Sequence, residues 1–306
     1  MPTVATDEQV RAAYALCEQM AGRDKPHLYA AAQLLSWPQA RRAFAATYAS
    51  MRVIDDYIDG IPHRATLPGP SRQIAARQID LWLEQVRRAR ADASATDGIW
   101  VALADTFDRF EFPLTPWEEL GRAMRSDLST PAFRDWDHLR EYMAGASVAP
   151  AVVFMHLVLM QPYGPGEDGC FRSPWPYMRV VEATEDLAIF CYWVHILRDV
   201  AADLTLGGGG LVYLPQEDLR RFGLSTPDLH RMRDSGRATD AYVRLAQFEA
   251  ERARFHLERG RTHLPELLAT APAGNALALT QLVETYVAVL QGLADHHYDV
   301  FAGLVT

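Results

Sequence analysis

Two pairs of aspartates are the residues of this sequence whose types and spacing most clearly indicate chemistry. Asp55 and Asp59 form one pair and Asp199 and Asp203 the other, each with the spacing D-x-x-x-D. On a helix this spacing places both carboxylates on one face, one turn apart. Both pairs lie in apolar segments, where an uncompensated charge is costly to bury. The pattern predicts carboxylates that face each other across a helical core and hold divalent cations, with Mg²⁺ favoured because it prefers oxygen ligands.

Further polar residues extend each pair into a stripe along its helix. Tyr48 and Arg52 precede the first pair, and Tyr192 and His195 precede the second, at steps of three or four residues. Such steps keep side chains on one helix face. An arginine beside two carboxylates is also typical of a structural ion pair, so one stripe alone would decide little. Two separate stripes on apolar helices favour a functional site.

The two stripes fit the ionisation of an allylic diphosphate. Mg²⁺ ions that bridge phosphate oxygens to carboxylates neutralise the departing pyrophosphate as Lewis acids. Arg52 would add fixed positive charge at the same place. An apolar, aromatic-lined cavity would shelter the carbocation from water and stabilise it through ring faces. We therefore expect a prenyl diphosphate donor as the first substrate.

The elements that must position these residues are helices throughout. Alanine, leucine and arginine dominate, strand signals are nearly absent, and apolar residues recur at helical spacing. Prolines and glycines divide this pattern. It predicts an all-α chain that forms a single domain over residues 1–306. The predicted helices cover residues 7–20, 27–36, 38–59, 71–92, 98–110, 116–128, 136–160, 174–204, 237–271 and 275–302.

Composition narrows the partners and the compartment. The net charge of −9 argues against nucleic acid as a partner. The three cysteines have no metal-binding spacing, and their odd number leaves no complete disulfide framework. The N-terminus does not resemble a signal peptide, so we expect a cytoplasmic protein. The apolar stretch 148–160 is too short to span a bilayer. We expect no transmembrane segment and leave peripheral membrane contact open.

The segments around both pairs resemble the squalene/phytoene synthase family. The run YASMRVIDDYID from Tyr48 to Asp59 is similar to the first Asp motif of that family. The run ILRDVAAD over residues 196–203, followed by VYLP at 212–215, is similar to the second. The resemblance extends over nearly the whole chain. It implies an all-α isoprenoid-synthase fold around a central active-site cavity, and a Mg²⁺-dependent prenyltransferase activity.

The resemblance also implies roles for individual residues. Four aspartates are expected to bind Mg²⁺ and diphosphate: Asp55, Asp59, Asp199 and Asp203. Tyr48 and Arg52 are expected to contact the diphosphate, and Tyr286 to line the cavity. Asp127 matches a further family acid near the site. Arg198 is expected to pair with a neighbouring aspartate.

Two departures from the family pattern lie in the second stripe. The family usually carries Gln and Asn where this chain has Tyr192 and His195, and the Asn is a metal ligand. His195 is interpreted either as a hydrogen-bonded core residue or as a proton acceptor or a donor to diphosphate. Tyr192 is interpreted either as packing or as an acceptor contact. Larger rings at both positions argue against a cavity for two long chains.

These departures favour transfer of the prenyl group to an aromatic acceptor, an indole- or carbazole-like ring of a natural product. A base such as His195 would accept the proton that the ring loses on rearomatisation. The alternative is head-to-head condensation of two prenyl diphosphates, which gives presqualene or prephytoene diphosphate and then a C30 or C40 hydrocarbon. A terpene cyclase and an inactive binding protein are further alternatives, and the four retained carboxylates count against the inactive protein.

Three other features give separate expectations. The run Gly207–Gly210 is expected to form a flap over bound diphosphate. The tryptophans are expected to be mostly core residues, and Trp193, beside the second motif, is the best candidate among them to face the cavity. His156, within an apolar helix, is expected to be a core residue.

Overall fold

The computed structural model describes residues 5–24, 26–91, 97–130, 132–161, 166, 169–205 and 212–302. Within these residues every regular element is helical. The one extended pairing among them is an isolated bridge between Phe110 and Phe171. The predicted all-α class is therefore confirmed.

Long helices alternate with short ones along the chain. In order they are α1 (Asp7–Asp24), α2 (Pro26–Gln33), α3 (Pro38–Asp59), the 3₁₀ turn η1 (Arg64–Thr66), α4 (Gly69–Ala91), α5 (Ile99–Arg109), α6 (Thr115–Asp127), α7 (Trp136–Met143), the π-helical turn η3 (Ala144–Val148), α8 (Ala149–Leu159), α9 (Tyr177–Asp203), α10 (Gln216–Arg221), α11 (Thr226–Ser235), α12 (Asp240–Arg261), α13 (Leu264–Thr270) and α14 (Ala273–Asp295).

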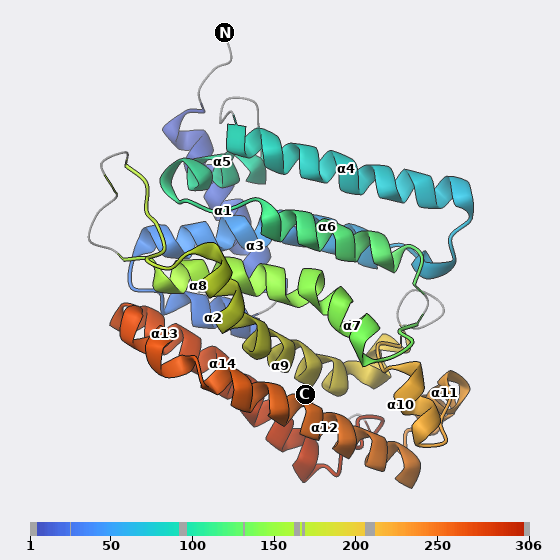
Figure 1. Ribbon diagram of the computed structural model, residues 1–306. Coiled ribbons are helices and arrows are strands. Elements are labelled where there is room, and N and C mark those ends of the chain that lie inside the picture. The colour runs from blue at the N-terminus through green and yellow to red at the C-terminus, as the bar shows by residue number, and fades with distance from the viewer. Residues whose placement is uncertain are drawn as a thin grey trace.

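The two helices that carry the aspartate pairs, α3 and α9, lie in the interior of the arrangement. Figure 1 shows α4 and α5 on one side of the molecule and α12, α13 and α14 on the other. Helix α8 packs against both α3 and α9. It thereby fixes the distance and angle between the two motif helices.

The sequence of α8 explains its central place. Its residues read APAVVFMHLVL, and Val152 through Leu159 are all buried. A helix that is apolar on all sides is stable only inside the protein. One connected hydrophobic cluster joins buried residues from Ala21 to Phe301. The single domain remains a prediction, and this shared cluster is the feature that supports it.

Two predicted helices differ from those observed. The range 237–271 contains α12 and α13, because the chain turns after Arg261 and Pro265 opens a new first turn. The range 275–302 ends at Asp295. His297 and Tyr298 adopt left-handed backbone conformations there, which no α-helix can continue through.

Helices α10 and α11 were not predicted. Helix α11 nevertheless carries a clear start signal, because Ser225 and Asp228 form a capping box with Pro227 in the first turn. Both helices are short, and helical periodicity is weakly visible over so few residues.

Two helical stretches of the described chain are long and apolar enough to cross a membrane by length and composition alone. They are Trp136–Leu159, 72% buried inside the protein, and Ala273–Asp295, 28% buried. The first is the core segment that links the motif helices, and buried helices of soluble proteins pass the same test. The absence of a transmembrane segment therefore stays a prediction.

The π-helical turn η3 joins α7 to α8 where they approach the motif helices. Gly145 lies against α6 so closely that an added Cβ would clash with the Glu119 carbonyl oxygen and lie 2.9 Å from the Ala123 Cβ. The Ser147 hydroxyl donates to the Ala188 carbonyl of α9 at 3.1 Å. Close packing at this turn therefore sets the position of α8.

We predict that Gly145→Ala lowers the free energy of unfolding by about 1–3 kcal/mol, because the added methyl group overpacks the contact with α6. Gly292→Ala in α14 is the control, since no atom lies within 4 Å of its added Cβ. It should be neutral or stabilise by about 0.4–1 kcal/mol. Urea unfolding followed by circular dichroism measures both. Equal effects of the two substitutions would contradict the close packing at η3.

Candidate active site

Both aspartate pairs lie at the carboxyl ends of their helices. Asp55 and Asp59 fall in the last five residues of α3, and Asp199 and Asp203 in the last five of α9. Neither helix has a basic residue in its last turn. The carboxyl end of a helix carries partial negative charge, so carboxylates there are unfavourable unless cations are supplied.

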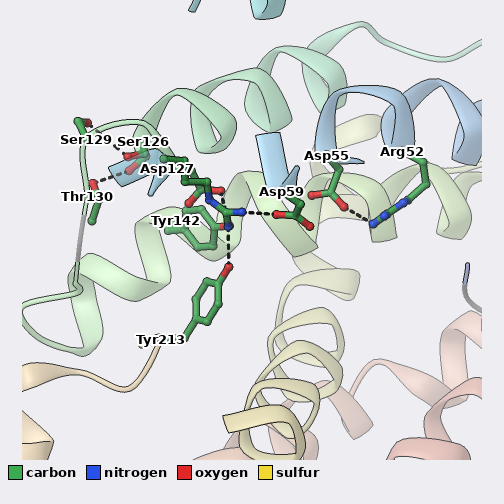
Figure 2. A network of polar contacts seen from close by, with 10 residues as sticks. Arg52, Asp55, Asp59, Ser126, Asp127, Ser129, Thr130, Tyr142 and Tyr213 are labelled. Atoms are coloured by element: carbon green, nitrogen blue, oxygen red, sulfur yellow. Dashed lines mark hydrogen bonds and ion pairs between the residues drawn. The ribbon is translucent and has the colours of Figure 1, made fainter. Parts of the chain in front are cut away.

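At the first pair the cations come from two arginines. Arg52 forms ion pairs with Asp55 and with its neighbour Asp56. Arg64 donates to Asp59 Oδ1 at 2.6 Å. The Asp55 and Asp59 side chains remain 31% and 51% exposed, so both are still accessible to a ligand. Figure 2 shows the Arg52, Asp55 and Asp59 side chains along the end of α3.

At the second pair Arg198 makes two hydrogen bonds to Asp199, of 2.6 and 2.7 Å. This confirms the expected pairing of Arg198 with a neighbouring aspartate. Its Nη2 also lies 2.8 Å from His195 Nδ1. The same Nδ1 lies 3.1 Å from Asp199 Oδ2. His195 is therefore part of the contact between Arg198 and Asp199.

A buried polar cluster lies between the two motifs. Asp127, at the end of α6, accepts from the Tyr142 hydroxyl at 3.2 Å. Arg64 Nη2 donates to the Tyr213 hydroxyl at 3.2 Å and lies 3.5 Å from Asp127. Figure 2 shows the Asp59, Asp127, Tyr142 and Tyr213 side chains gathered in one place. We call Arg64, Asp127, Tyr142 and Tyr213 the polar cluster.

The charges of both motifs affect the pKa values of tyrosines in and beside the polar cluster. Burial raises the pKa of Tyr213, and the negative charges of Asp127, Asp59 and Asp203 raise it further against the opposing effect of Arg64. Burial also raises the pKa of Tyr192 on α9, with contributions from Tyr213, Asp127 and Asp55 and an opposing hydrogen bond with Tyr142. Asp203 and Tyr213 also line one hollow, so the second motif lies beside the polar cluster.

Two further predicted residues, Tyr286 and Tyr48, lie near the second motif. Burial raises the pKa of Tyr286 on α14. Cys191, Asp199 and Tyr48 raise this pKa further, and the positive charge of Arg198 opposes the rise. Tyr286 is thus close both to the second motif and to Tyr48 of α3. The Tyr48 ring stacks on Phe44 at 5.7 Å between ring centres. The structure places both tyrosines near the aspartate pairs.

Within the described part of the chain, no three His, Cys, Asp or Glu side chains come close enough to hold one metal ion. The predicted ligands therefore do not form a closed metal site made by the protein alone. Mg²⁺ in proteins usually keeps several waters and uses one or two carboxylates together with substrate phosphates. The two half-exposed pairs fit that mode, in which a diphosphate completes the coordination.

A small hollow of about 10 Å³ adjoins the second motif. Its lining is mostly apolar, with Asp203 and Tyr213 as the polar members: Ile196, Val200, Asp203, Leu204, Val212, Tyr213, Leu214 and Leu229. The larger central cavity implied by the resemblance stays a prediction.

Comparison with known proteins agrees with this arrangement. The model of the family described as squalene/phytoene synthase matches residues 22–306.

The chain belongs to the squalene/phytoene synthase family.

Relatives of this family member include the 15-cis-phytoene synthases of Synechocystis sp. and Synechococcus elongatus. The first is 28% identical over 98% of this chain and 82% of its own length, and the second 29% identical over 94% and 86%. Members of the family are prenyltransferases, and this chain is one of them.

Solved structures show the same fold. A squalene synthase from Alicyclobacillus acidocaldarius superimposes with a TM-score of 0.73 and 22% identity, covering 96% of this chain and 97% of its own. A dehydrosqualene synthase gives a TM-score of 0.74 at 22% identity, covering 95% of this chain and 89% of its own. The isoprenoid-synthase fold expected from the sequence is thereby confirmed.

Three weaker expectations have different outcomes in this family member. Trp193 is fully buried and donates to the Glu249 carbonyl of α12, so it packs against that helix and the expectation of a cavity-facing Trp193 is wrong. His156 is a buried core residue, as predicted. The expected flap Gly207–Gly210 lies outside the described residues.

Burial raises the pKa of Asp127 to about 7, with Arg64 and Tyr142 opposing the rise and Asp59 and Asp55 adding to it. An unfolded aspartate has a pKa of about 3.9. The folded protein therefore binds more protons between these values, and stability falls as pH rises from about 4 to about 7.

We predict that Asp127→Asn flattens this pH dependence by up to about 4 kcal/mol, because three pKa units correspond to roughly that free energy. Urea unfolding at pH 4.5, 6 and 8 measures it. Asp80→Asn, an exposed surface carboxylate paired with Arg125, should leave the wild-type slope unchanged. Parallel profiles for wild type and Asp127→Asn would show that Asp127 does not titrate in this range.

Proposed function

We propose that this protein condenses two prenyl diphosphates head to head in a Mg²⁺-dependent reaction. The product would be presqualene or prephytoene diphosphate and then a C30 or C40 hydrocarbon. The observation that carries the proposal is the contact of Asp59 with the polar cluster, together with the hollow that Asp203 of the second motif lines with Tyr213. The phytoene synthases that match nearly the whole chain support the same reaction.

The aromatic acceptor that the sequence analysis preferred has no support from the comparisons. It rested on Tyr192 and His195, and in the structure both side chains have protein partners. Tyr192 hydrogen-bonds Tyr142, and His195 contacts Arg198. These contacts give both residues partners within the protein, and His195 also lies 3.1 Å from Asp199. We therefore favour the alternative, head-to-head condensation of two prenyl diphosphates. Prenyl transfer to an aromatic ring is one of the outcomes that the experiment below distinguishes.

In this proposal the carboxylates of Asp55, Asp59, Asp199 and Asp203 hold the diphosphates through Mg²⁺. When bound, the ions supply positive charge that stabilises the departing pyrophosphate. The exposed fractions of Asp55 and Asp59 allow this contact.

Two arginines within the motifs contribute positive charge to the site. Arg52 and Arg198 lie within the two motifs, where they already neutralise neighbouring carboxylates. They keep the site from becoming strongly negative before substrate binds, and they add fixed positive charge beside a bound diphosphate.

The aromatic residues shield the reacting carbon. Tyr192, Tyr213 and Tyr286 all have raised pKa values because they are buried, so they remain neutral phenols at physiological pH. Neutral rings beside the diphosphate site exclude water and present electron-rich faces to a carbocation. A second prenyl diphosphate supplies the double bond that attacks the cation.

A product assay by mass spectrometry tests the proposal. Protein with Mg²⁺ is offered geranyl, farnesyl and geranylgeranyl diphosphate, each alone and with hydroxylated indoles and carbazoles. We expect a hydrocarbon or cyclopropyl diphosphate built from two identical chains, formed without an acceptor and lost with EDTA. A prenylated ring formed only when the acceptor is present would overturn head-to-head condensation.

We predict that Asp55→Ala and Asp199→Ala each reduce turnover by at least about a hundredfold, the scale for loss of one group that stabilises charge at a reacting centre. The helical circular dichroism signal and cooperative melting should persist, because both side chains are partly exposed. Asp80→Ala is the matched control and should retain wild-type turnover. Full activity in either motif variant would refute the two-motif mechanism.

A further inference from the structure

Arg64 is a buried cation that neither aspartate motif contains. It opens the 3₁₀ turn η1, five residues after Asp59, and its side chain is only 6% exposed. Its guanidinium contacts Asp59 at 2.6 Å, Tyr213 at 3.2 Å and Asp127 at 3.5 Å. These partners come from the end of α3, the end of α6 and the segment after α9. One side chain therefore joins three separate parts of the site.

The backbone before Arg64 is arranged to turn the side chain inward. His63 has φ 53° and ψ 35°, a left-handed conformation that is unfavourable for a residue with a Cβ. Such conformations persist where the surrounding structure requires them, and they are frequent at functional sites. Here the conformation starts the turn that buries Arg64.

A purely structural account would make Arg64 the counter-ion of the buried Asp127. The distances do not fit that account alone. The shortest contact is to Asp59, whose side chain is 51% exposed. The contact with Asp127 is longer, at 3.5 Å. The guanidinium therefore serves Asp59 as well as Asp127.

The contact with Asp59 leaves a defined ligand face. Arg64 occupies Oδ1, and the carboxylate keeps its remaining lone pairs for another cation. A hydrogen bond to one oxygen of a ligand carboxylate fixes the direction of the other. The same guanidinium fixes the Tyr213 phenol, which also feels Asp203 of the second motif.

We propose that Arg64 is a positioning residue, which orients the Asp59 carboxylate for a divalent cation and ties it to Tyr213 and Asp127. The inference rests on the proposed Mg²⁺–diphosphate function of the first motif. It adds to that function a residue outside both motifs.

The test is Arg64→Lys, which keeps the positive charge but lacks the planar fork that spans three partners. Mn²⁺ binding in the presence of inorganic pyrophosphate, followed by electron paramagnetic resonance, is the readout that needs no turnover. We expect binding about 10–100-fold weaker than in the wild type, a melting temperature close to wild type, and a fall in kcat. Wild-type Mn²⁺ affinity in Arg64→Lys would overturn the proposal.

Arg109→Lys is the matched control. Arg109 makes two 2.9 Å hydrogen bonds to Asp105 with its fork, but it lies outside both motifs and the polar cluster. Its substitution should leave Mn²⁺ affinity unchanged. A wild-type protein that binds no Mn²⁺ with pyrophosphate would overturn the metal-dependent function, and this inference with it. Equal binding by wild type and Arg64→Lys would overturn this inference alone.

A second pair of variants applies if Arg64→Lys does not fold. Arg64→Gln combined with Asp127→Asn leaves no unpaired charge in the buried cluster, and Asp127→Asn alone is its reference. If Arg64 only repels the metal, the double variant should bind Mn²⁺ more tightly than Asp127→Asn. If Arg64 positions Asp59, the double variant should bind Mn²⁺ more weakly than Asp127→Asn. Tighter or equal binding would therefore overturn the proposal.

Discussion

The accumulation of carboxylates at the negative ends of helices is the constraint on which this structure depends. Asp59, Asp127 and Asp203 are the last residues of α3, α6 and α9, and each helix directs its carboxyl end toward the site. Helix dipoles and like charges both oppose this arrangement. Acids gathered in this way are unfavourable for stability, so the arrangement requires positive charge nearby.

The arginines of the chain meet part of that demand before any ligand binds. Arg52 pairs with Asp55 and Asp56, Arg198 with Asp199, and Arg64 with Asp59. Because these pairs are local, the site stays folded while the carboxylates remain partly exposed. In the proposed function, divalent ions held together with a diphosphate compensate the remaining negative charge. Charge compensation by the protein and charge compensation by the ligand are therefore parts of one arrangement.

The apolar scaffold explains how such a charged site stays in place. Helix α8 is buried on all sides and packs on both motif helices, and the close contact at Gly145 fixes its entry from α7. The polar cluster then lies between elements that cannot shift independently. The architecture agrees with membership of the squalene/phytoene synthase family. Tyr192 and His195 are the two positions in the second motif helix at which this chain departs from the residues usual in that family.

The sequence alone determined the all-α class, the family and the aspartate pairs, because helical periodicity and the D-x-x-x-D spacing are local properties of the chain. The pairing of Arg198 with Asp199 also follows from adjacency. Only the tertiary structure decided the partners of Arg64, Tyr142 and Trp193. Arg64 lies between prolines with no informative spacing, and its partner Tyr213 is 149 positions away. Contacts between residues so far apart in sequence arise from helix packing, and no local pattern encodes which side chains that packing brings together.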